Sequence, residues 1–148
     1  MSCQLRFSAI DFDVESYLLT SKLRPHEIFK KGDYQQTVLA SWLTENSGFC
    51  VTASAADFDD LTSQIIDVSN FIRQHIQELE RLGKIKEEKV IFFFDFGITT
   101  TLFEDDVWVQ SFHFPVELLL LLSRIGAGLK ISSYYPTSED DEEEANLN

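Results

Sequence analysis

The stretch KVIFFFDFG, residues 89–97, decides the fold of this chain. Its five consecutive residues from Val90 to Phe94 are β-branched or aromatic, which favours a strand over a helix. Because the run is apolar on both of its side-chain faces, it is typical of a strand that is covered from both sides, either by helices on opposite faces or by an oligomer. We therefore predict a central strand here, extending toward Thr101, against which the other elements pack.

The longest helical pattern comes just before this strand. Over residues 58–82, apolar side chains recur at steps of three or four and form one continuous stripe. Aspartates at its beginning suit the positive end of a helix, and Gly83 suits its C-terminal stop. The pattern predicts one long helix with one face on a sheet and the other in water.

Shorter patterns predict the remaining elements. Runs rich in β-branched and aromatic residues predict strands at residues 4–10, 38–44, 49–53, 107–112 and 129–134. Residues 14–21 and 116–125 are predicted to be short helices, the second of them opening after Pro115. The polar turn after residue 44 indicates a hairpin over 38–53, and residues 26–34 are predicted to be a connecting segment.

These elements predict a single α+β domain over residues 1–136. Its sheet is expected to be mostly antiparallel with five to six strands, packed with one long and two short helices. A chain of 148 residues fits one domain and buries a sufficient core without disulfides or metals. Residues 137–148 are acidic and lack an apolar pattern, which predicts a disordered acidic tail.

The chain is strongly acidic, with a formal net charge of −13, of which six charges come from residues 139–144. An acidic surface repels nucleic-acid phosphates and anionic lipid headgroups, so we expect neither nucleic acid nor a membrane as partner. A basic protein is the partner that this charge favours. High net charge also keeps a protein soluble without any partner.

The sequence also predicts a cytoplasmic location. Its longest aliphatic run is far shorter than the roughly 20 residues of a membrane span, and its N-terminus lacks a signal-peptide pattern. Cys3 and Cys50 have neither a zinc-site nor a disulfide-framework spacing, which fits a reducing compartment.

None of the short motifs carries a complete chemical site. Asp95-Phe96-Gly97 spells a kinase-like DFG, but the glycine-rich loop, paired lysine and HRD loop are missing. Gly126 and Gly128 follow a helix, whereas phosphate-binding glycines precede one. The acidic clusters at 57–60 and 104–106 lack the spacing of a calcium loop. We therefore predict no catalytic, cofactor-binding or metal-binding residues; whether the chain is an enzyme stays open, with the balance against it.

Three residues are nevertheless candidates for a reactive pocket. His113 stands between two phenylalanines just before a predicted helix, Cys50 lies in a predicted strand, and Asp95 ends the core strand. Each also has a simpler interpretation as a structural residue, and for Cys50 this is a buried, inert thiol. His26 and His75 lack metal-site spacing, and we expect His75 to be solvated.

Four large aromatic residues lie on or beside predicted strands: Trp42, Trp108, Tyr134 and Tyr135. If these side chains are exposed together, they form a binding hot spot; if they are buried, they belong to the hydrophobic core. We favour the core interpretation.

Several short motifs recur in an order that resembles a known family. In chain order they are LRFSAI at 5–10, DFD at 11–13, LRP at 23–25, KGD at 31–33, SW at 41–42 and GAGLKISSYY at 126–135. This order resembles the bacterial domain-of-unknown-function family 4279, over residues 3–136. The resemblance implies a small bacterial α+β domain, and it implies no activity and no catalytic residues.

Three functions remain open on the sequence. The first is a non-enzymatic protein-interaction domain, one form of which is an immunity or antitoxin-type inhibitor of a basic partner. The second is a small-ligand-binding or hydrolytic protein with a pocket near His113. The third is a self-associating structural protein.

Overall fold

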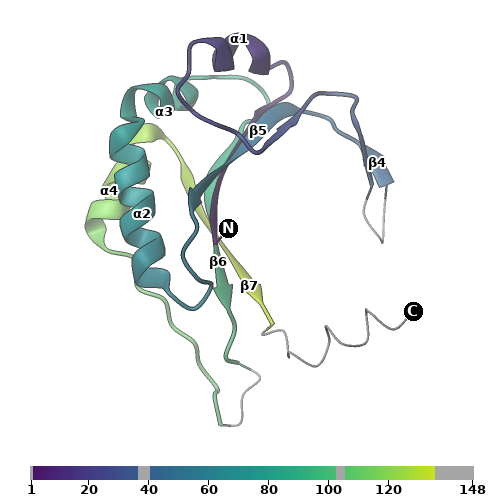
Figure 1. Cartoon of the computed structure of the whole chain (residues 1–148). Helices are drawn as coiled ribbons and strands as arrows, with labels where there is room; N and C mark the ends of the chain where they lie inside the picture. The colour runs from purple at the N-terminus through teal and green to yellow at the C-terminus, as the bar shows by residue number, and fades with distance from the viewer. Residues whose placement is uncertain (1, 37–40, 103–105, 136–148) are drawn as a thin grey trace.

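The structure of the protein, a computed structural model, describes residues 2–36, 41–102 and 106–135. The predicted acidic tail at 137–148 lies outside the described residues. Within them, a curved sheet carries all of its helices on one face (Figure 1). None of the helices described here reaches the length and apolar character that a bilayer crossing needs.

The main sheet has five strands in the order β2-β5-β1-β6-β7. β1 (Cys3–Ala9) is the middle strand and pairs antiparallel with β5 (Ser47–Ser54) and with β6 (Ile91–Thr99). β2 (Glu27–Phe29) pairs antiparallel with β5 at one edge, and β7 (Gly128–Tyr134) pairs parallel with β6 at the other. The α+β class and the mostly antiparallel sheet are thus confirmed, although β1 rather than β6 occupies the centre.

A separate two-stranded ribbon, β3 (Tyr34–Gln36) with β4 (Ser41–Leu43), corrects the predicted hairpin. β4 pairs with β3, whereas β5 pairs with the longer and more apolar β1, which offers it a buried face. The predicted connection at 26–34 was also wrong, because it contributes edge strand β2. A three-residue strand is too short for its side-chain alternation to be visible in sequence.

Four helices pack on the sheet: α1 (Val14–Leu19), α2 (Leu61–Gln74), α3 (Ile76–Gly83) and α4 (Val116–Ile125). α1 and α2 begin at aspartate caps, whose side chains accept hydrogen bonds from the backbone N–H three residues on, at 3.0 and 2.9 Å. α4 begins after Pro115, as predicted, and ends at Gly126 in the left-handed conformation (φ 74°).

The single long helix predicted over 58–82 is wrong, because the chain bends at His75. This residue has φ −111° and ψ 19°, outside the helical region, and separates α2 from α3. The apolar stripe continues across the bend because both helices bury it in the same core, through Val68 and Ile72 on α2 and Leu79 and Leu82 on α3. Periodicity alone therefore could not reveal the bend.

Within this chain β6 is buried on one face only, so helices on opposite faces do not supply the two-sided cover that was predicted; cover by an oligomer stays a prediction. Phe92, Phe94 and Phe96 point into the helix-covered core. On the opposite face Ile91 is 36% exposed and Phe93 is half-buried. No helix of the described part of the chain lies on this open face (Figure 1).

Residues 107–112, predicted to be a strand, form no strand in the structure. Gln110 holds this segment by its side chain, donating to the Thr99 carbonyl at 3.0 Å and accepting from the Thr101 N–H at 3.2 Å. The β-branched and aromatic residues of the segment favour a strand, but in the described part of the chain no strand pairs with them.

Candidate functional site

The structure does not gather His113, Cys50 and Asp95 into one site. Cys50 lies on β5 and Asp95 on β6, with β1 between those two strands. His113 is exposed in the segment that precedes α4. Among the described residues, no group of three or more His, Cys, Asp or Glu is arranged to hold a metal ion.

Asp95 has a structural role at the junction of β6 and β7. Its carboxylate lies 3.0 Å from the Lys130 ammonium and accepts a 2.7 Å hydrogen bond from the Ser132 hydroxyl. The Lys130 ammonium also lies 5.4 Å from the centre of the Phe93 ring, on the open face. These contacts bind the parallel edge strand to its neighbour.

Cys50 is a buried free thiol, and burial raises its pKa to about 11, with Arg6 opposing the rise and Glu27 adding to it. A pKa near 11 in place of 9.0 leaves about a hundredfold less thiolate at neutral pH. We expect iodoacetamide to alkylate the native Cys3→Ala variant at least about a hundredfold more slowly at pH 7 than the same chain unfolded in urea. Mass spectrometry over time measures both rates; fast labelling of the native chain would contradict an inert Cys50.

His75 is not solvated, contrary to the sequence prediction. Its side chain is 12% exposed, and its Nδ1 lies 3.2 Å from Glu78 Oε2. The Glu78 carboxylate also accepts hydrogen bonds from the Lys22 backbone N–H at 2.7 Å and the Ser21 hydroxyl at 3.3 Å. The Tyr17 hydroxyl donates to the Glu78 carbonyl at 3.0 Å. Glu78 thereby fastens the segment after α1 to the bend between α2 and α3.

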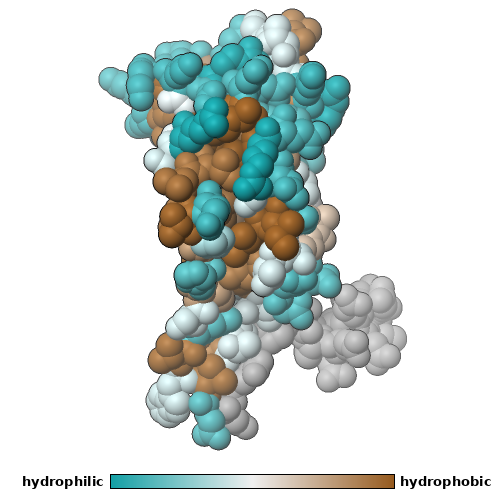
Figure 2. Space-filling view, turned by 90° about the vertical axis from the view of Figure 1, so that its left-hand side faces the viewer, coloured by the Kyte–Doolittle hydropathy of each residue, from teal (hydrophilic) through white to brown (hydrophobic). Residues whose placement is uncertain are grey.

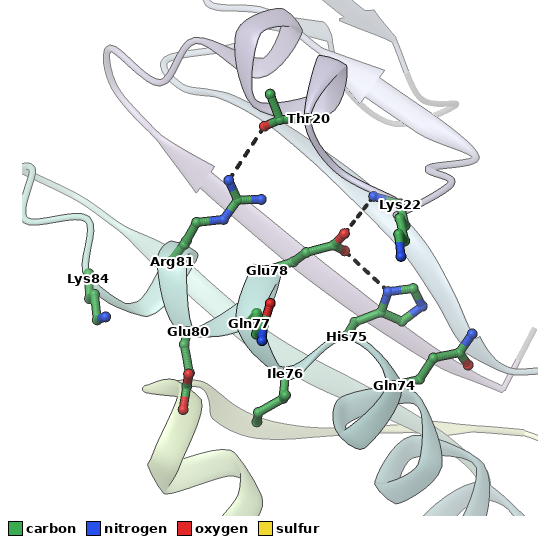
Figure 3. Close-up of a pocket in the computed structure, with 10 residues that line it drawn as sticks. All are labelled: Thr20, Lys22, Gln74, His75, Ile76, Gln77, Glu78, Glu80, Arg81 and Lys84. Atoms are coloured by element: carbon green, nitrogen blue, oxygen red, sulfur yellow. Dashed lines mark hydrogen bonds and ion pairs between the residues drawn. The ribbon is translucent and has the colours of Figure 1, made fainter.

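Glu78 and His75 also line an open hollow of about 680 Å³, which we call the α3 hollow. It is lined by α3, the end of α2 and the segment after α1 (Figure 3). Three cationic side chains line it, those of Lys22, Arg81 and Lys84. Sequence reasoning missed this site because Lys22 is distant in sequence from the other two.

An apolar surface covers the outer side of two packed helices. It consists of Ile66 on α2 and Val116, Leu119 and Leu120 on α4, which are 45–64% exposed, and we call it the α2–α4 surface. Figure 2 shows apolar groups gathered on this side of the molecule. The signal was in the sequence: residues 118–122 are five consecutive leucines, and no helix can bury all of them on one sheet.

The described aromatic candidates are exposed, so the core interpretation is wrong for them. Trp108 is 89% exposed, and Tyr134 and Tyr135 are also exposed. Tyr134 packs edge-on against the Phe58 ring at 5.3 Å. The side chain of Trp42 lies outside what the structure describes. Trp108 belongs to the unpaired segment before α4, which explains why no core forms around it.

Comparison with protein-family models, with curated proteins and with solved structures finds no match to this chain. The resemblance to the domain-of-unknown-function family therefore stays a prediction.

Proposed function

We propose that this protein is a non-enzymatic interaction domain that binds a basic, amphipathic segment of a partner protein through the α2–α4 surface. The observation that carries the proposal is the exposure of four large apolar side chains on two adjacent helices. Soluble monomers rarely leave such groups together in water, and where they do the patch commonly serves binding. An immunity or antitoxin-type inhibitor of a basic protein is one form of such a domain.

The apolar groups supply affinity. Covering a half-exposed leucine contributes about 1 kcal/mol, so the four side chains together contribute about 4 kcal/mol before ordering costs. That amount supports only weak binding by itself. Further contacts are needed, and the exposed Trp108, in the segment that leads into α4, is one aromatic residue that could provide them.

Charge supplies the preference for a basic partner. The chain carries a net charge of −13, which attracts a basic protein over distance and speeds its association. Glu117 is an exposed acid on α4, the helix that carries three of the four apolar groups. On the same two helices, Arg124 is paired with Glu80 at 2.7 Å, whereas Arg73 is an exposed opposing charge. The free, buried cysteines agree with a cytoplasmic location, which is part of the proposal.

The test replaces an apolar group by a charge. We expect Leu120→Asp to weaken partner binding at least about tenfold, because it buries a carboxylate against the partner's apolar face. Leu19→Asp is the matched control: Leu19 is 86% exposed on α1. Affinity captures from the native host, using wild type and both variants as baits, identify a candidate that is then purified and measured by calorimetry at low and high salt.

The expected partner is basic, binds wild type and Leu19→Asp equally, and loses affinity as salt rises. Equal binding to all three proteins, or an acidic partner, would refute the proposal. Analytical ultracentrifugation of the purified protein distinguishes partner binding from self-association. If wild type is a dimer and Leu120→Asp is a monomer, the α2–α4 surface binds a second copy of the chain instead of a partner protein.

A further inference from the structure

We propose that the α3 hollow is an anion-binding site that takes a phosphate group, with Arg81 as its main contact and Lys22 and Lys84 as flanking cations. This inference is independent of the α2–α4 surface and of any protein partner. Three features support it: the net charge of the hollow, the placement of the Arg81 side chain, and the size and polarity of the hollow.

The first step is the local charge. The chain has 12 Lys and Arg against 25 Asp and Glu, yet three of these cations line one hollow. Of the two carboxylates that line the hollow, Glu80 is paired with the Arg124 guanidinium at 2.7 Å, whereas Glu78 accepts hydrogen bonds from the Ser21 hydroxyl and the Lys22 backbone N–H and keeps its negative charge. Lys22 and Lys84 form no ion pair within the residues that the structure describes. Three cations against the one remaining carboxylate, Glu78, leave the hollow with a positive net charge.

The second step is the positioning of Arg81. Its guanidinium carbon lies 5.5 Å from the centre of the Tyr17 ring, within the range of a cation–π contact, which favours this placement of the side chain. Within the described residues its hydrogen bond goes to Thr20 Oγ1, at the long distance of 3.5 Å. Figure 3 shows Arg81 reaching from α3 toward Thr20 across the hollow. A guanidinium placed over the hollow, with N–H groups left for a ligand, matches the paired oxygens of a phosphate.

The third step is the size and polarity of the hollow. Its volume of about 680 Å³ lies in the range of small-molecule sites. Its lining is polar apart from Ile76, and the amides of Gln74 and Gln77 add hydrogen-bond donors. Such a lining suits a hydrophilic, charged ligand. The acidic charge elsewhere on the chain lowers the affinity for an anion; screening by salt, over about 8 Å under physiological conditions, reduces this repulsion relative to the attraction of the cations that line the hollow.

The test is a titration of the ¹⁵N-labelled full chain followed by NMR. Inorganic phosphate is one probe, and ribose 5-phosphate is the second, which asks whether an organic phosphate binds more tightly than the free ion. We expect shifts at the backbone amides of residues 20–22 and 74–84 and at the Arg81 side chain. Sodium chloride at matched ionic strength is the control for a general salt effect.

Three variants locate the site. Arg81→Gln should weaken phosphate binding about tenfold, since a hydrogen bond to a charged group is lost. Lys84→Gln, at the solvent-facing end of α3, should weaken it about threefold without removing the Tyr17 contact. Lys31→Gln removes the same charge outside the hollow, where Lys31 lies 3.4 Å from Asp11, and should leave binding unchanged. Shifts elsewhere, shifts equal to those with chloride, or equal losses in all three variants would overturn the proposal.

Discussion

Replacing Phe94 by alanine is expected to lower the free energy of unfolding by about 3–5 kcal/mol, whereas Phe93→Ala next to it should cost about 1 kcal/mol. The two residues are neighbours in the same strand and have the same side chain. They differ in the face of β6 from which they project. Phe94 is completely buried under the helices, and Phe93 is half-buried on the open face.

The size of the Phe94 effect follows from what surrounds it. Its ring packs edge-on against Phe71 of α2 at 6.1 Å, within the cluster that joins the sheet to the helices. Removing it leaves a cavity between rigid elements that cannot close fully. Phe93 is covered in part by the Lys130 ammonium, which can move or be replaced by water.

Urea denaturation of wild type and both variants measures the two losses in the free energy of unfolding. The dependence of this free energy on urea concentration is compared among the three proteins, because a change in it would mean that the unfolding transition itself has changed. A large and equal loss in both variants would mean that the open face is covered in solution. In that case the midpoint of Phe93→Ala should depend on protein concentration, because a second copy would be the cover.

The comparison of Phe93 with Phe94 also shows what the sequence could and could not predict. A run of apolar residues indicates a strand, and β6 formed where that run predicted it. The run does not say how much of each face is covered, because the cover comes from distant residues such as Lys130. The same reason applies to residues 107–112, which have strand-forming side chains but no partner strand.

The candidate surfaces were only partly visible in sequence. Five consecutive leucines at 118–122 indicate that some of α4 stays exposed, and composition indicates the preference for a basic partner. The α3 hollow carried no such signal. It depends on the bend at His75 and on the Glu78 contacts that bring Lys22 to α3, and neither is encoded by a local pattern.

Replacing Gly83 by alanine is expected to destabilise the protein by about 2 kcal/mol. Alanine is the better helix former by about 1 kcal/mol, which alone would stabilise α3. However, an added Cβ at Gly83 would overlap the carbonyl oxygen of Ile125, the last residue of α4. Backbone atoms cannot move aside by changing rotamer, so α3 and α4 must separate, at a cost in the upper part of the roughly 1–3 kcal/mol typical of overpacking.

This result also tests why the glycine is there. The sequence indicates Gly83 as a helix stop, which would require a left-handed conformation, but Gly83 is the last residue of α3 itself and the following Lys84 is right-handed helical. Gly128→Ala is the matched control, because an added Cβ there meets its nearest atom at an ordinary 3.6 Å. Thermal or urea unfolding should show a clear loss for Gly83→Ala and almost none for Gly128→Ala. A stabilised Gly83→Ala variant would show that α3 and α4 do not approach each other backbone to backbone.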